Sequence, residues 1–101
     1  MDRFDELRDK ILPILLPYGV KRIALFGSVV RGEETPESDI DILVELKELG
    51  QRPPIGLKWF GIEQELSRLL GREVELVSVR SLSPHVRPYI EKDMVVLYEE
   101  G

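Results

Sequence analysis

Apolar positions along the chain switch between helical spacing and short continuous or alternating runs, a pattern typical of a mixed α/β domain. Apolar residues that recur at helical spacing, from Phe4 to Leu15, predict a first helix over about 3–16. Pro13 has no N–H and disfavours helical geometry at the residue before it. We therefore expect a kink or an early end of this helix at Pro13.

Four short segments predict β-strands. Residues 20–26 form an apolar run that ends at Gly27, typical of a buried strand that enters a tight turn. Residues 39–46 alternate acidic and aliphatic side chains, which indicates a second strand. Residues 73–79 fit a third strand and residues 94–98 a short last one.

Three further helices separate these strands. Residues 28–32 predict a short helix directly after the first strand. An apolar stripe predicts a long helix over about 55–70, which Gly71 ends in the C′ position. A last short helix is expected over 83–92, with Ser83 as its cap. The resulting order is α-β-α-β-α-β-α-β, so the expected fold class is α/β (α+β): a small mixed sheet flanked by helices, with the strand over 39–46 in its centre.

Length and composition limit the possible classes of protein. A chain of 101 residues with 43% apolar and 33% charged residues suits a single globular domain over 1–101. The chain has no cysteine, which excludes disulfides and thiolate-bound zinc. The longest apolar stretch, 11–20, is broken by two prolines and too short for a membrane span. We expect a cytoplasmic protein. The net charge of −5 disfavours binding of free nucleic acid.

The pair Gly27-Ser28 lies where a predicted strand meets a predicted helix. Glycine allows the backbone to approach a phosphate, because it has no Cβ. The N–H groups at the start of a helix and the Ser28 hydroxyl can then bind anionic oxygens. Taken alone, such a pair is usually an ordinary loop, so it gains meaning only from its surroundings.

Asp39 and Asp41 are two residues apart in a predicted strand, so both side chains point to the same face. Aspartate is disfavoured in strands, and like charges on one face repel. Magnesium removes this repulsion, because it takes carboxylate oxygens and keeps water and substrate phosphates as its other ligands. The alternative is an exposed acidic face on an edge strand.

Glu75 is a third acid inside a predicted strand. If that strand neighbours the second, Glu75 lies across from the two aspartates. Three carboxylates on adjacent strands suit a site with two metal ions, roughly 3.5–4 Å apart. The alternative is that Glu75 is a solvated strand residue.

The order of these residues resembles a known signature. The stretch 27–32 (Gly-Ser-Val-Val-Arg-Gly), six further residues and then Asp39-Ile40-Asp41 are similar to the motif of the DNA polymerase beta-like nucleotidyltransferase superfamily, and the length is similar to that of its minimal nucleotidyltransferases. The resemblance implies that Gly27 and Ser28 contact the triphosphate of ATP.

The same resemblance assigns the acidic residues. It implies that Asp39 and Asp41 bind two Mg²⁺ ions and that Glu75, as a third ligand, helps to activate the acceptor hydroxyl. Aspartate is common at the third position in the family, so glutamate there is a departure. Arg31 fits the motif and is expected either to contact the nucleotide or to form a structural salt bridge.

The resemblance also implies a partner. Minimal nucleotidyltransferases are commonly paired with a small helical toxin of the HEPN type and, as antitoxins, add AMP to one of its tyrosines. Leu57 and Phe60 flank the apolar stripe of the long predicted helix, and we expect them to be either the edge of the core or a docking surface for this partner. Two other hypotheses remain: an inactive binding subunit, and a transferase for a small-molecule hydroxyl, as in aminoglycoside resistance.

Overall fold

The computed structural model describes residues 3–33, 35, 38–48, 50 and 55–100. Its centre is one four-stranded sheet in the order β3-β2-β1-β4. The strands are β1 (Val20–Phe26), β2 (Ile40–Leu46), β3 (Val74–Ser78) and β4 (Val95–Glu99). β1 pairs antiparallel with β2 and β4, whereas β2 and β3 are parallel. The predictions of a mixed sheet and of a central second strand are therefore confirmed.

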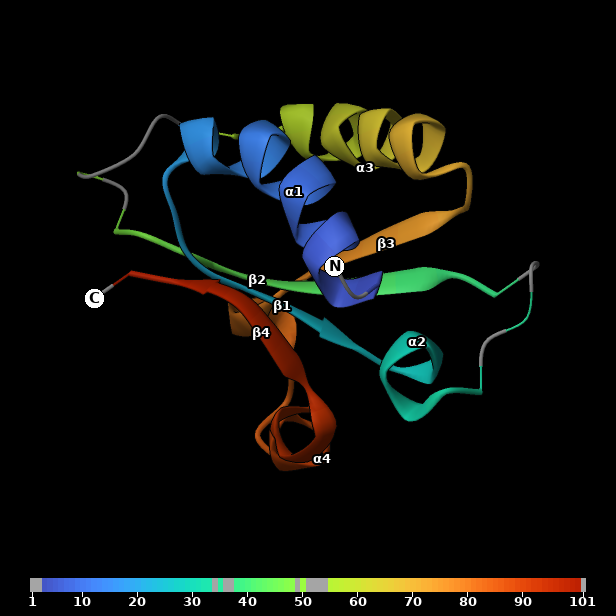
Figure 1. Cartoon of the computed structure of the whole chain (residues 1–101). Helices are drawn as coiled ribbons and strands as arrows, with labels where there is room; N and C mark the ends of the chain where they lie inside the picture. The colour runs from blue at the N-terminus through green and yellow to red at the C-terminus, as the bar shows by residue number, and fades with distance from the viewer. Residues whose placement is uncertain (1–2, 34, 36–37, 49, 51–54, 101) are drawn as a thin grey trace.

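The helices cover the two faces of the sheet unequally. They are α1 (Arg3–Leu15), α2 (Ser28–Arg31), α3 (Lys58–Leu70) and α4 (Arg87–Asp93), with 3-10 turns η1 (Leu16–Tyr18) and η3 (Val79–Ser81). Figure 1 shows α1 and α3 on one face, with α4 on the other and α2 at the end of β1. None of the described helices is long and apolar enough to cross a membrane.

The first helix has the predicted extent, without the early end considered at Pro13, whereas the start predicted for the last helix is wrong. The first helix does not end at Pro13: α1 continues to Leu15, which is only 1% exposed, so burial of Leu15 holds the last turn. The last helix begins at Arg87 rather than 83. Ser83 instead closes a turn, in which its Oγ accepts from Val86 N at 3.2 Å. A helix that began at 83 would place Pro88 in its interior, where the ring collides with the carbonyl four residues earlier.

The larger core lies between the sheet and the α1–α3 layer. Alternation along β2 sends Ile40, Ile42 and Val44 into this core, each no more than 1% exposed. The intervening side chains face the α4 layer, where Leu43 joins a smaller apolar cluster with Ala24 on β1. Because Asp41 alternates with Ile40 and Ile42, it lies on this second face, next to a smaller core.

The outer edge of β3 is covered by side chains of α3. Val74 N donates to Ser67 Oγ at 2.9 Å, and Leu76 N donates to Glu63 Oε2 at 2.9 Å. These bonds satisfy backbone groups that would otherwise be open to another strand. They also fix β3 against α3, and so fix its position beside β2.

We predict that Glu63→Ala lowers the free energy of unfolding by about 1–2 kcal/mol, because Leu76 N loses a charged acceptor in a partly buried place. Glu65→Ala removes the same charge from an exposed position of the same helix, and its effect should stay within about 0.5 kcal/mol. Urea denaturation of both variants measures the difference. Equal effects would show that the cap on β3 contributes nothing.

Candidate active site

Gly27 joins β1 to α2 in a backbone conformation that favours glycine, with φ 79° and ψ −151°. Its carbonyl accepts from Val30 N at 3.1 Å and from Arg31 N at 3.2 Å, which starts the helix. A Cβ at Gly27 would overlap the Oδ2 of Asp41 and lie 3.3 Å from its Cγ. Glycine is thus required here for both conformation and space, and the Gly27-Ser28 turn directly adjoins the Asp41 carboxylate.

The predicted acids converge at the β2–β3 pair. Asp41 and Glu75 are register partners on the two parallel strands, and their side chains are close enough to share a hydrogen bond when one of the two carboxyl groups is protonated. Asp39 lies exposed immediately before β2 and close enough to act on Asp41 by its charge. The expectation that Glu75 lies across from the aspartates is confirmed for Asp41. The predicted strand boundary at 39 is wrong by one residue, because β2 begins at Ile40 and Asp39 precedes it. The roles of the three acids remain a prediction.

This crowding changes the acidity of Asp41. Partial burial is the largest cause that raises the pKa of Asp41 from 3.8 to about 6, followed by the charges of Glu75 and Asp39 and the hydrogen bond with Glu75. The positive charge of Arg31 lowers the pKa of Asp41. The site thus holds more negative charge than its own cations offset, and a cation from outside would relieve it.

Of the two alternatives expected for Arg31, the salt bridge is present, and the nucleotide contact stays a prediction. Arg31 ends α2 and forms an ion pair with Glu33, with Nε 3.3 Å from Oε1. Its charge also acts on Asp41. The side chain is 48% exposed, so a nucleotide at the Gly27-Ser28 turn could compete with Glu33 for its guanidinium.

Arg72, which the motif does not include, contacts the turn before Asp39. Its Nε donates to Ser38 O at 3.1 Å, and its Nη2 donates to Thr35 O at 2.8 Å. The sequence indicates this role of Arg72 only by its place directly after Gly71, because the residue that follows a helix end has a fixed position.

The acids suit a metal that brings part of its own coordination shell. No group of three or more His, Cys, Asp or Glu in the described part of the chain is arranged to hold a metal ion by itself. Magnesium usually binds through one or two carboxylates and completes its shell with water and substrate phosphates. The hard oxygen donors and the unrelieved charge at Asp41 fit such an ion together with a triphosphate.

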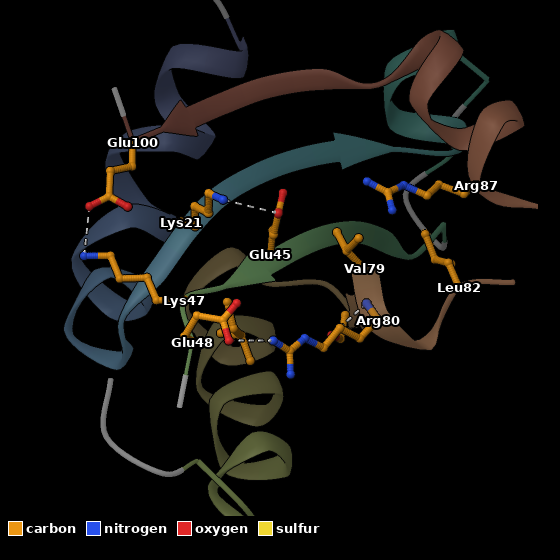
Figure 2. Close-up of a pocket in the computed structure, with 11 residues that line it drawn as sticks. Lys21, Glu45, Lys47, Glu48, Val79, Arg80, Leu82, Arg87 and Glu100 are labelled. Carbon is orange, nitrogen blue, oxygen red and sulfur yellow. Dashed lines mark hydrogen bonds and ion pairs between the residues drawn. The ribbon is translucent and has the colours of Figure 1, made fainter. Parts of the chain in front are cut away.

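A hollow of about 400 Å³ lies at the opposite end of β2, on the α4 side (Figure 2). None of the predicted site residues lines it. Its charged side chains pair with one another, as in Lys47 Nζ with Glu100 Oε1 at 3.1 Å and Arg80 Nη2 with Glu48 Oε2 at 3.9 Å. The hollow is therefore separate from the acidic site.

Comparison with known families decides what this arrangement belongs to. Residues 7–97 match the model of the nucleotidyltransferase domain. The chain belongs to the nucleotidyltransferase domain family. The matched region of this nucleotidyltransferase domain includes the Gly27-Ser28 turn, both aspartates and Glu75.

Two archaeal relatives resemble this nucleotidyltransferase domain over most of its length. A Methanocaldococcus jannaschii protein, whose name describes it as a candidate protein adenylyltransferase, is 40% identical over 91 residues, 90% of this chain and 94% of the relative. The protein adenylyltransferase MntA of Thermococcus cleftensis is 40% identical over 78 residues, 77% of this chain and 75% of the relative.

Solved structures share the fold. A crystal structure of a toxin-antitoxin with AMP-PNP matches with a TM-score of 0.78 and 26% identity, over 92% of this chain and 73% of that one. A structure of the tri-AMPylated HEPN toxin of Shewanella oneidensis in complex with MNT antitoxin matches with a TM-score of 0.72 and 23% identity, over 96% of this chain and 73% of that one. The predicted polymerase beta-like nucleotidyltransferase fold is confirmed.

We predict that Asp41→Asn stabilises the metal-free protein at pH 7.5. Because the folded-state pKa of Asp41 is raised to about 6, the folded protein holds this proton more tightly than the unfolded chain does. Wild type therefore loses stability as the pH rises from about 4 to 6, and the variant escapes this loss. Thermal melts in EDTA should show an advantage of a few degrees at pH 7.5 that shrinks by pH 4. Asp9→Asn, at an exposed position of α1, is the charge-matched control. An Asp41→Asn variant less stable than wild type at pH 7.5 would contradict the prediction.

A second prediction compares two glycines with positive φ. Gly27→Ala introduces both backbone strain and an overlap with Asp41, whereas Gly32→Ala, at φ 72°, meets nothing within 4 Å. We expect Gly32→Ala to cost only the strain, about 1–2 kcal/mol of stability. Gly27→Ala should in addition weaken Mg²⁺-dependent binding of AMP-PNP by at least about tenfold, or 1.4 kcal/mol, in calorimetry. Equal binding by the two variants would separate Gly27 from the site.

Proposed function

We propose that this chain is a Mg²⁺-dependent protein adenylyltransferase, which transfers AMP from ATP to a hydroxyl of a small helical partner protein. The observation that carries the proposal is the pairing of Asp41 with Glu75 beside the Gly27-Ser28 turn, in a chain of the nucleotidyltransferase domain family. The name of the Thermococcus relative and the bound AMP-PNP of the toxin-antitoxin structure support AMP and ATP as the transferred group and its donor.

The residues of the turn would hold the triphosphate. Gly27 lets the chain approach the phosphates closely, and Ser28 offers its hydroxyl and the N–H groups at the start of α2. Arg31, at the other end of this short helix, would add positive charge near the phosphates. These contacts would orient the α-phosphorus toward Asp39, Asp41 and Glu75.

The acids would organise the transfer. Asp39 and Asp41 would be the ligands of two Mg²⁺ ions, with Glu75 as an additional ligand. Bound there, the ions would neutralise the phosphate charge and lower the pKa of the attacking hydroxyl. Glu75, already within hydrogen-bond reach of Asp41, would accept the proton of that hydroxyl. The hydroxyl oxygen then forms a bond to the α-phosphorus, and pyrophosphate leaves.

We propose a HEPN-type toxin as the acceptor, with a tyrosine as the modified residue, so that this chain acts as the antitoxin. The Shewanella complex, in which a HEPN toxin carries AMP, supports this choice. Leu57 and Phe60 are 88% and 63% exposed near the start of α3 and offer apolar surface for docking a protein. The net charge of −5 makes free RNA a poor alternative acceptor.

We predict that incubation with ATP and Mg²⁺ increases the mass of the co-purified HEPN-type partner by about 329 Da, or a multiple of it, because each transfer adds AMP with loss of pyrophosphate. Intact-mass spectrometry measures the gain. Asp39→Asn should abolish it without changing co-purification. Asp9→Asn, which removes the same charge from α1, should leave it intact.

Two results would count against the proposal. A partner whose mass stays unchanged, beside a control enzyme that is active in the same buffer, would make this chain a binding subunit. Transfer of AMP to an aminoglycoside but not to the protein would assign it to small-molecule modification.

A further inference from the structure

Asp39 lies outside the strand ladder, yet its backbone is held on both sides. On one side, Ile40 N donates to Glu73 O at 2.9 Å. On the other, Ser38 O accepts from Arg72 Nε at 3.1 Å and also from Arg72 Nη2. Both contacts come from consecutive residues, 72 and 73, at the start of the segment that leads into β3. Two adjacent anchors therefore set the position of Asp39 relative to Glu75.

Thr35 and Ser38, which Arg72 contacts, are also bonded to each other. Ser38 N donates to Thr35 O at 3.0 Å, and Thr35 N donates to Ser38 Oγ at 2.9 Å. Arg72 Nη2 donates to Thr35 O at 2.8 Å, so one guanidinium binds the carbonyls of both residues. Ser38, directly before Asp39, is therefore held both by Thr35 and by Arg72.

Arg72 is itself fixed by the end of α3. Gly71 ends the helix in the left-handed conformation, with φ 69°, and Arg72 N then donates back to Ser67 O at 3.2 Å. Leu66, in the same last turns, is completely buried. The guanidinium therefore projects from a rigid base at the end of α3 toward the residues that precede β2.

We propose that Arg72 is a positioning residue for the metal site: its planar pair of donors holds the Ser38–Asp39 peptide so that the Asp39 carboxylate meets the same ions as Asp41. This inference rests on the proposed function. The effect is geometric, since the cation that lowers the pKa of Asp41 is Arg31. An arginine can bind two carbonyls at once through its fixed fork, which the single ammonium of lysine does not reproduce.

The experiment compares Arg72→Lys with Arg72→Met in the full chain. Calorimetric titration with AMP-PNP at a series of Mg²⁺ concentrations gives the Mg²⁺ concentration for half-maximal binding. Residues that orient metal ligands typically contribute about 10- to 100-fold in metal affinity or activity. We expect an increase of that size for both variants, with lysine nearly as impaired as methionine. In transfer assays, kcat should fall while the KM for the partner stays close to that of wild type.

Arg22→Met is the matched control. Arg22 is also an inward-placed arginine, with a side chain only 16% exposed, and it forms ion pairs with Glu45 at 3.3 Å and Glu91 at 3.6 Å, away from Asp39. Its loss should lower the melting temperature and leave the Mg²⁺ dependence unchanged. All titrations are made at a temperature where circular dichroism shows each variant to be folded. If Arg72→Met does not fold, the titration of Arg72→Lys alone tests the inference.

Three results would overturn the inference. If the Mg²⁺ concentration for half-maximal AMP-PNP binding in Arg72→Lys stays within twofold of wild type, either a positive charge alone is enough or the contact has no effect on the metal site. An equal shift in Arg22→Met would reduce Arg72 to a general structural role. A rise in the KM for the partner with unchanged kcat would show that Arg72 acts in binding the partner protein and not in positioning the metal ligands. If wild type binds Mg²⁺ and AMP-PNP but transfers no AMP, the proposed function fails, while the binding titrations still decide the role of Arg72.

Discussion

The parallel pairing of β2 with β3 is the constraint on which the rest of the structure depends. It places Glu75 beside Asp41, and Asp39 adds a third charge from the end of β2. Carboxylates so close together repel each other, and the raised pKa of Asp41 reflects first its partial burial and then that repulsion. The arrangement persists because the opposite face of the same strand is buried: Ile40, Ile42 and Val44 anchor β2 in the larger core.

The local features of the site could be predicted from the sequence, because each follows from alternation along a few residues. Asp41 alternates with Ile40 and Ile42, so the face on which it lies follows without knowledge of the partner strands. The turn at Gly27 is marked by an apolar run that ends in Gly-Ser. The start of α4 was harder to predict, because two prolines compete for it: Pro88 suits the first turn of α4 and would disrupt a helix that began at Ser83.

The contacts that complete the site could not be predicted, since they join residues far apart in the chain. Arg72 and Ser38 are 34 residues apart, and no periodicity relates them. The close approach of Gly27 to Asp41 likewise depends on the antiparallel register that pairs Phe26 with Asp41. Sequence reasoning assigned this glycine to phosphate binding alone, whereas its missing Cβ also makes room for the carboxylate.

The glutamate at position 75, where aspartate was expected from the family resemblance, has a physical explanation in this geometry. Neighbouring strands are about 4.8 Å apart, and a side chain must lean across that gap to reach its partner. Glu75 is the register partner of Asp41, and its longer side chain has the reach for its carboxyl group to interact with that of Asp41. The departure from the family pattern therefore does not separate these two acids.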